Sequence, residues 1–287
     1  KYGFFIGGGN VDSMVSHYSV AKIPRAEDEY SPGGKAGARP DRSATVYTKL
    51  AKQAYPDLPV ILGGLEASLR RFAHYDYWLD TVLPSIAEDS GADALLHVTP
   101  YYNKASQTGL IKHYEYIADR TQLPIILYNV PSRTGVSFTA DTYRVLSENP
   151  KINGVKEASG NFSLLAHTRY VCPDDFYIWS GNDDQVVPMM SLGAKGVISV
   201  VSNIAPDVMV KMSHLCLDGK FEEASKIQIQ YMDLIDALFC EVNPIPVKAA
   251  MNLMGMEAGP LRLPLCDISE KNLAVLRASL ERMDLLK

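Results

Sequence analysis

Positive charge is not in excess in this sequence. Its 28 Lys and Arg residues are outnumbered by 33 Asp and Glu, which gives a formal net charge of -5 at pH 7. The basic residues are scattered along the chain and form no stripe of the kind that binds phosphate backbones. We therefore expect no nucleic-acid partner.

Long apolar runs are missing as well. No stretch approaches the roughly 18 apolar residues that a membrane-spanning helix needs, and the first residues lack the order of a signal peptide. We expect no membrane partner and a cytoplasmic location. The chain begins with Lys1 rather than Met, so we also expect that its natural start is missing.

Cysteine is scarce. The four cysteines are Cys172, Cys216, Cys240 and Cys266. Their spacing matches neither a zinc knuckle nor a redox pair, so we expect buried free thiols and no metal site. His97, inside the run LLHVTP, is expected to be a core residue without a chemical role.

From residue 92 onward, short β-rich runs alternate with amphipathic segments. The runs are ADALLHV, PIILYNV, INGVK, FYIWSG and GVISVV. The segments between them carry apolar residues three and four apart, as helices that cover a sheet do. This repeated order predicts a parallel sheet, and its steady interval favours a barrel. After Val201 the remaining segments, KFEEASKIQIQYMDLIDALF among them, predict a helical tail.

The first 91 residues are different. Their candidate strands, YGFFIG (2–7) and PVILGG (59–64), are separated by a loop-like tract rich in Gly, Pro and charge. With the five strands after residue 92, the chain then has seven candidate strands, one fewer than an eightfold barrel needs. We place the missing strand before Tyr47. We predict an α/β fold, a (β/α)8 TIM barrel. Its parts are an atypical N-terminal segment (1–91), βα units (92–218) and a C-terminal helical region (219–287).

Two polar side chains stand at the ends of consecutive apolar strands. Tyr128 ends IILY and Lys156 ends INGVK, so both open onto one rim if the strands share a parallel sheet. A lysine that apolar neighbours desolvate is a usable nucleophile. The pattern therefore indicates imine chemistry on a small keto acid. By spacing alone, a solvated lysine paired with Glu157 is the commoner alternative.

Seven motifs extend this observation. They are VTPYYNK, LYNVPSRTG, GVKEASG, SGNDD, GVISVVSN, EVNPIPVKAAMNLMG and GPLRLPL. With these motifs, residues 92–287 resemble dihydrodipicolinate synthase, a family of class I lyases with a (β/α)8 barrel. The resemblance implies an imine between Lys156 and pyruvate, whose enamine attacks L-aspartate 4-semialdehyde to give 4-hydroxy-tetrahydrodipicolinate. It implies no cofactor, a role in lysine and diaminopimelate biosynthesis, and a homodimer or homotetramer.

The resemblance also implies residue roles. Tyr128 matches a proton-relay tyrosine, and Tyr102 one that completes a neighbouring subunit's relay across a dimer interface. Arg133 matches the residue that holds the aldehyde substrate's carboxylate, while Gly181 and Ile198 match the lining of the pyruvate pocket. Each of these residues has a structural alternative. Tyr128 would cap the core, Tyr102 would be an exposed loop aromatic and Arg133 would form a loop salt bridge. Packing alone would explain Gly181 and Ile198.

One departure lies upstream. The family carries a Gly-Thr-Thr-Gly-Glu loop where this chain has GGGN (7–10), and Asn10 or Ser13 would replace only part of its hydrogen bonding. We therefore expect weak or absent synthase activity and no inhibition by lysine. Residues 2–91 instead resemble the N-terminal region of an uncharacterised radical S-adenosylmethionine protein family, as in a chimera. No cysteine precedes Cys172, so that half would hold no iron–sulfur cluster.

Three hypotheses stay open on the sequence. The first is a pyruvate-dependent lyase of the synthase type. The second is a catalytically inactive barrel or a related pyruvate-dependent aldolase. The third is a remnant of a radical enzyme that binds S-adenosylmethionine through GGG and GGLEAS, a weak signal because such glycines occur in many turns.

Overall fold

The computed structural model of this chain divides into two compact units. The residues that the structure describes are 4–8, 14, 17–19, 21–28, 31, 35–63, 70, 74–83 and 85–286. The first unit is Lys1–Val155 with Tyr170–Phe176, and the second is Lys156–Arg169 with Tyr177–Lys287. Each unit is described by itself.

A parallel sheet forms the centre of the first unit. Its strands lie in the order β1 (Phe4–Gly8), β2 (Val60–Gly63), β5 (Ala94–Val98), β6 (Ile125–Asn129) and β7 (Ile152–Glu157), and the last two residues of β7 belong to the second unit. Leu95 pairs with Ile125 and Val98 with Tyr128. Both faces bury apolar side chains, which explains the near-continuous apolar runs. These five predicted strands are confirmed.

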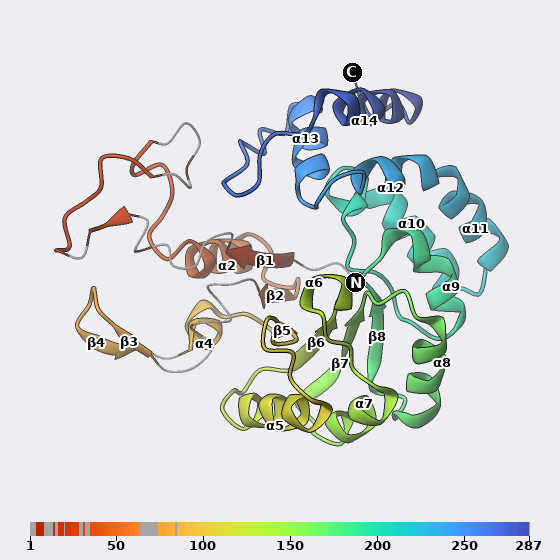
Figure 1. The fold of residues 1–287 in the computed structure, drawn as a ribbon, viewed down its shortest axis with the longest axis horizontal. Helices are drawn as coiled ribbons and strands as arrows, with labels where there is room; N and C mark the ends of the chain where they lie inside the picture. The colour runs from red at the N-terminus through yellow and green to blue at the C-terminus, as the bar shows by residue number, and fades with distance from the viewer. Residues whose placement is uncertain are drawn as a thin grey trace. The chain divides into compact units, whose positions relative to one another are not determined.

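Helices cover this sheet. They are α2 (Ser43–Ala54), α4 (Ile86–Ser90), α5 (Gln107–Ala118), α6 (Pro131–Thr134) and α7 (Ala140–Ser147). Of these, α5 and α7 lie in the segments where apolar spacing predicts helices, whereas α2, α4 and α6 were not predicted. The Ser106 hydroxyl caps α5 by accepting the Gly109 N–H, and Figure 1 shows α5 and α7 on the same side of β5–β7. Buried Tyr114 on α5 donates its hydroxyl to the carbonyl of His97, which is itself buried as predicted.

The described residues before Tyr47 do not supply the eighth strand. Beyond β1 they form isolated antiparallel bridges, Tyr18 with Pro24 and Glu27 with Lys35. The same unit holds a hairpin that the sequence did not indicate, β3 (His74–Asp76) paired with β4 (Thr81–Leu83). Its turn is closed by the Asp76 carboxylate, which accepts the N–H groups of Trp78 and Leu79.

The second unit begins with the end of β7 and continues through α8 (Phe162–Val171), β8 (Tyr177–Ser180), a 3-10 turn η2 (Asp183–Gln185) and α9 (Val186–Ser191). The last two residues of α8 belong to the first unit. The predicted strand GVISVV is wrong as a strand. It makes one parallel bridge, Val197 with Ser180, and then turns into η3 (Val201–Asn203). Two N–H groups at its end donate to a buried carboxylate, described below, and are therefore not available for a strand ladder.

Helices make up the rest of the second unit, as predicted. They are α10 (Pro206–Leu217), α11 (Phe221–Gln230), α12 (Met232–Leu238), α13 (Ile245–Leu253) and α14 (Glu270–Arg282). The long amphipathic segment forms two helices, because the chain turns at Tyr231 between α11 and α12. Pro246 lies in the first turn of α13, a position that tolerates proline because no intrahelical N–H donor is needed there.

All four cysteines are free, but the prediction that they are buried is only half right. Cys172, directly after α8, and Cys216 on α10 are buried. Cys240 and Cys266 are exposed, because they lie in the connections after α12 and before α14. Within the described residues, no helix is long and apolar enough to cross a membrane.

Candidate active site

Lys156 lies near the carboxyl end of β7, where its side chain is half-buried. The neighbouring Glu157 is 4% exposed, and its Oε1 accepts the Ser159 N–H at 2.8 Å. This bond closes the turn that ends the strand. The side chain of Lys156 therefore leaves the sheet at a fixed point, between strand and turn.

Gly181 follows β8 beside the lysine. Its N–H donates to the Glu157 carbonyl at 2.8 Å. A Cβ atom at this position would lie 2.6 Å from Ala158 Cβ and 3.2 Å from Lys156 Cε. Only glycine leaves the lysine chain this path, so the residue is needed for space rather than for an unusual backbone conformation.

Ile198 joins the same corner of the second unit. Its N–H donates to the Ser180 carbonyl at 2.8 Å, and its side chain is half-buried. The structure therefore brings three predicted residues, Lys156, Gly181 and Ile198, to the ends of neighbouring backbone segments. This is the arrangement that a pocket above the carboxyl ends of parallel strands requires.

Asp183 is a residue of this corner to which the sequence assigned no role. It is 1% exposed, and its Oδ2 accepts the N–H groups of Val200 at 2.9 Å and Val201 at 3.1 Å. Burial raises the pKa of its carboxyl, while hydrogen bonds and the charge of Lys156 oppose that rise. The motif SGNDD places two carboxylates directly after a strand, but this pattern is equally typical of turn residues and does not single out Asp183.

Tyr128 stands near the end of β6 in the first unit. Its carbonyl accepts the Thr99 N–H at 3.3 Å, and its side chain is half-buried. Burial raises the pKa of the phenol, and the positive charge of Arg133 acts in the opposite direction. Thr99 is fully buried, and within the described part of the chain its hydroxyl has no hydrogen-bond partner.

The loop that carries Arg133 is tightly held. Arg133 is exposed on the short helix α6, which follows β6 directly. Buried Asn129 bonds through its side chain to the Ser137 hydroxyl and to the Phe138 N–H. A Cβ atom at Gly135, where φ is +68°, would lie 3.0 Å from Lys104 Cε. The loop of residues 101–104 therefore lies against this one.

Tyr102 lies on that neighbouring loop and points into solvent. It is 90% exposed and has a left-handed backbone with φ 67°. Such a conformation is uncommon for a residue with a side chain and costs on the order of 1 kcal/mol. Its exposure agrees with the implied role at a subunit interface and equally with a solvent-exposed loop aromatic.

The six predicted site residues thus fall into two groups. Tyr102, Tyr128 and Arg133 belong to the first unit, whereas Lys156, Gly181 and Ile198 belong to the second. Asn10 and Ser13 of the region that replaces the threonine loop lie outside the described residues. Most of GGLEAS, residues 64–68, lies outside them as well.

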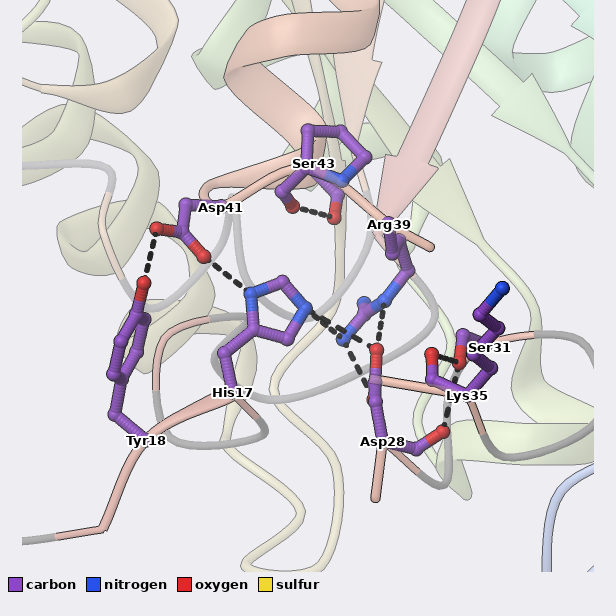
Figure 2. A network of polar contacts seen from close by, with 9 residues as sticks. His17, Tyr18, Asp28, Ser31, Lys35, Arg39, Asp41 and Ser43 are labelled. Carbon is purple, nitrogen blue, oxygen red and sulfur yellow. Dashed lines mark hydrogen bonds and ion pairs between the residues drawn. The ribbon is translucent and has the colours of Figure 1, made fainter. Parts of the chain in front are cut away.

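A separate polar cluster occupies the N-terminal part of the first unit (Figure 2). Asp28, 1% exposed, accepts Arg39 Nε at 3.1 Å and Arg39 Nη2 at 3.3 Å. Figure 2 shows His17 between this carboxylate and that of Asp41, which also accepts the Tyr18 hydroxyl at 3.0 Å. The cluster borders a cavity of about 120 Å³. Among the described residues, no group of three or more His, Cys, Asp or Glu side chains is arranged to hold a metal ion.

Comparison with known families supports the synthase resemblance. The model of the Dihydrodipicolinate synthetase family matches residues 82–283. A 4-hydroxy-tetrahydrodipicolinate synthase from Clostridium novyi is 52% identical over 195 residues, which are 68% of this chain and 66% of the relative. The corresponding protein from Acetivibrio thermocellus is 50% identical over 204 residues, 71% of this chain and 69% of the relative. The chain thus spans about two thirds of the length of these relatives.

Solved structures agree with the fold. Dihydrodipicolinate synthase from Thermotoga maritima has a TM-score of 0.76 at 37% identity and covers 86% of this chain and 83% of its own. The chloride-inhibited enzyme from Acinetobacter baumannii complexed with pyruvate has a TM-score of 0.76 at 35% identity, with 85% and 82% covered. These likenesses confirm the predicted α/β barrel fold with C-terminal helices. The family model matches residues 82–283, and only four residues follow 283. A structural match to 86% of this chain is longer than residues 82–287, so it must also include residues before 82.

Proposed function

The chain belongs to the Dihydrodipicolinate synthetase family, and from that premise we propose that it is a 4-hydroxy-tetrahydrodipicolinate synthase. It condenses pyruvate with L-aspartate 4-semialdehyde in lysine and diaminopimelate biosynthesis. The observation that carries the proposal is Lys156 at the end of β7, beside a glycine whose missing side chain leaves room for the lysine.

The first step is the attack of the Lys156 amine on the keto carbon of pyruvate. Loss of water gives an imine, and loss of a proton from the methyl carbon gives the enamine that attacks the aldehyde. The amine must be uncharged to attack, as for any lysine that forms an imine. Gly181 and Ile198 border the pyruvate in this proposal, and no metal or organic cofactor takes part.

Tyr128 supplies and removes protons in the proposed reaction. Its raised phenol pKa keeps the hydroxyl protonated near neutral pH, so that it can donate when a carbinolamine loses water and accept afterwards. The positive charge of Arg133 stabilises the phenolate form, and this eases the step in which the hydroxyl donates its proton.

Arg133 binds the carboxylate of the aldehyde substrate in the proposed complex. It is exposed on α6, and the chain after this helix is hydrogen-bonded to the Asn129 side chain. A guanidinium fork suits a planar carboxylate. Tyr102 completes the relay of a second subunit in a homodimer or homotetramer. One structural relative is a monomeric dihydrodipicolinate synthase variant, so the fold alone does not fix the number of subunits. A cytoplasmic location without nucleic-acid or membrane partners stays a prediction.

The second candidate is a barrel with little or no synthase activity, or a related pyruvate-dependent aldolase. The chain has GGGN where the family has its threonine loop, and this observation favours weak turnover with an intact lysine site. The resemblance of residues 2–91 to a radical S-adenosylmethionine family also stays a prediction. Since no cysteine precedes Cys172, it adds no radical chemistry to the proposal.

A coupled assay with pyruvate and L-aspartate 4-semialdehyde tests the proposed activity. We expect measurable turnover by the natural sequence and its complete loss in Lys156→Ala. The matched control is Lys151→Ala, because Lys151 starts the same segment but donates to the carbonyls of Ala118 and Thr121. Equal rates in all three proteins would refute the proposal, and adduct formation without turnover would favour the second candidate.

A further inference from the structure

Asp183 is a buried carboxylate for which the proposed reaction has no use. It begins η2, two residues after Gly181, and is 1% exposed. Burying a carboxylate is costly unless hydrogen bonds compensate it. Its contacts therefore indicate what the residue does in the fold.

The carboxylate holds the segment that contains Ile198. Asp183 Oδ2 accepts the N–H of Val200 at 2.9 Å and that of Val201 at 3.1 Å. These two donors lie two and three residues after the pocket residue Ile198, whose own N–H donates to the Ser180 carbonyl. One end of this short segment is thus bonded to Ser180 at the end of β8, and the other to Asp183 at the start of η2.

Asp183 is itself fixed from the opposite side. Gln228 of α11 is 6% exposed, and its Nε2 donates to the Asp183 carbonyl at 2.8 Å. Its Oε1 accepts the Val187 N–H at 3.3 Å. A side chain of the C-terminal helical region therefore sets the position of Asp183, and Asp183 sets that of the Ile198 segment.

The same carboxylate is close enough to Lys156 for their charges to interact. The charge of Lys156 works against the rise that burial causes in the Asp183 pKa. Gly181, two residues from Asp183, would touch the lysine chain if it carried a Cβ atom. We call the two hydrogen bonds from the Val200 and Val201 N–H groups to Asp183 the clamp. The clamp and the nucleophile Lys156 thus lie in the same corner of the second unit.

We propose that Asp183 is a positioning residue of the Lys156 site. By accepting two backbone N–H groups it keeps Ile198 at the wall of the pyruvate pocket, and it touches none of the reacting atoms. This inference rests on the proposed function, because the occupant of the pocket is pyruvate on Lys156.

Two substitutions separate the clamp from the charge. Asp183→Asn keeps an oxygen of the same shape for Val200 and Val201 but has no charge, whereas Asp183→Ala has no acceptor. Asp184→Asn is the matched control, because Asp184 is the exposed neighbour. The readouts are the pyruvate concentration that gives half-maximal borohydride-trapped adduct, kcat, and the exchange rates of the Val200 and Val201 amides without pyruvate.

We expect Asp183→Ala to raise the half-maximal pyruvate concentration on the order of 10-fold, because a displaced wall misplaces the ligand. Asp183→Asn should stay within about threefold of the natural sequence, since one acceptor oxygen remains. The two amides should exchange faster in Asp183→Ala and at nearly the natural rate in Asp183→Asn. Asp184→Asn should match the natural sequence in every readout.

Unchanged pyruvate binding in Asp183→Ala would overturn the inference. Equal losses in Asp183→Ala and Asp183→Asn would overturn it too, because charge rather than the clamp would then matter. If Asp183→Ala does not fold, Gln228→Met takes its place, and unchanged amide exchange there counts against the clamp. If the natural sequence forms no adduct, the proposed function fails, and amide exchange alone decides on Asp183.

Discussion

Gly181 gives the most direct steric test at the scale of single residues. In Gly181→Ala the new Cβ would meet Ala158 Cβ at 2.6 Å and Lys156 Cε at 3.2 Å. We expect a loss of about 1–3 kcal/mol in unfolding free energy from this overpacking. Pyruvate binding should fall on the order of 10-fold beyond that, because the lysine is displaced. Urea unfolding and adduct titration measure the two effects separately, and an unchanged titration would contradict the described path of Lys156.

Tyr128 offers a chemical test at the same scale. Tyr128→Phe removes the hydroxyl while keeping the ring that fills the end of β6. We expect kcat to fall about 10²- to 10⁴-fold, the usual contribution of a general acid–base group. Trapped adduct should still form, only more slowly. Tyr170→Phe, at an 87% exposed position, is the control. Full activity in Tyr128→Phe would remove the residue from the mechanism.

Single residues also show what the sequence could and could not predict. Lys156 and Tyr128 were found because each ends an apolar run, and Gly181 because a motif surrounds it. Asp183 was not found, because an Asp after a strand is usually a turn residue. Its importance comes from Val200, Val201 and Gln228, which are distant in sequence and offer no local signal.

The start of helix α14 is held by hydrogen bonds to the Glu241 carboxylate, and these bonds give a prediction at the scale of an element. Glu241 Oε1 accepts the Ser269 N–H, the Ser269 hydroxyl and the Asn272 amide at 3.0, 2.7 and 2.8 Å. Hydrogen bonds from Ser269 and Asn272 lower the pKa of the Glu241 carboxyl. The stabilisation is therefore complete above the unfolded-state pKa of about 4.3 and is lost as the pH falls through the lower folded value.

Glu241→Gln removes this pH dependence, because the amide accepts at every pH. Thermal unfolding midpoints between neutral pH and about pH 3 should fall less steeply in the variant than in the natural sequence. Glu270→Gln, at an exposed position in the first turn of α14, should keep the natural slope. Identical slopes for Glu241→Gln and the natural sequence would show that this network does not hold α14.

The N-terminal polar cluster of Figure 2 gives a second element-scale prediction. Asp28→Ala removes the buried carboxylate that Arg39 contacts through two nitrogens. Breaking a buried pair from one side should cost about 3 kcal/mol in unfolding free energy. Glu222→Ala breaks the exposed pair with Lys226 and should cost no more than about 0.5 kcal/mol. Urea unfolding decides between them, and equal small losses would mean that the cluster contributes no stability.

Elements were predicted well where periodicity is strong and poorly where a distant contact decides. β1, β2, β5, β6, β7 and β8 lie where apolar runs predicted them. GVISVV has the composition of a strand, but its last two N–H groups donate to the Asp183 carboxylate, and η3 begins at the second of them, Val201. The hairpin β3–β4 was missed because its strands are short and its turn depends on the side chain of Asp76.

At the scale of the whole molecule, the family model and the structural match place the boundary of the synthase-like part differently. The family model begins at residue 82, whereas solved structures also match residues before it. The predicted boundaries at 91 and 218 stay predictions. The sequence could not decide how the first segment contributes, because β1 and β2 are separated by more than fifty residues without a clear repeat.

The central claim is that Lys156 forms an imine with pyruvate, and borohydride trapping tests it most directly. The protein is incubated with pyruvate, reduced, digested and mapped by mass spectrometry, with Lys151 as an internal reference in the same segment. We predict a reduced pyruvyl group on Lys156 and none on Lys151. An unmodified Lys156, or equal modification of both lysines, would contradict the account.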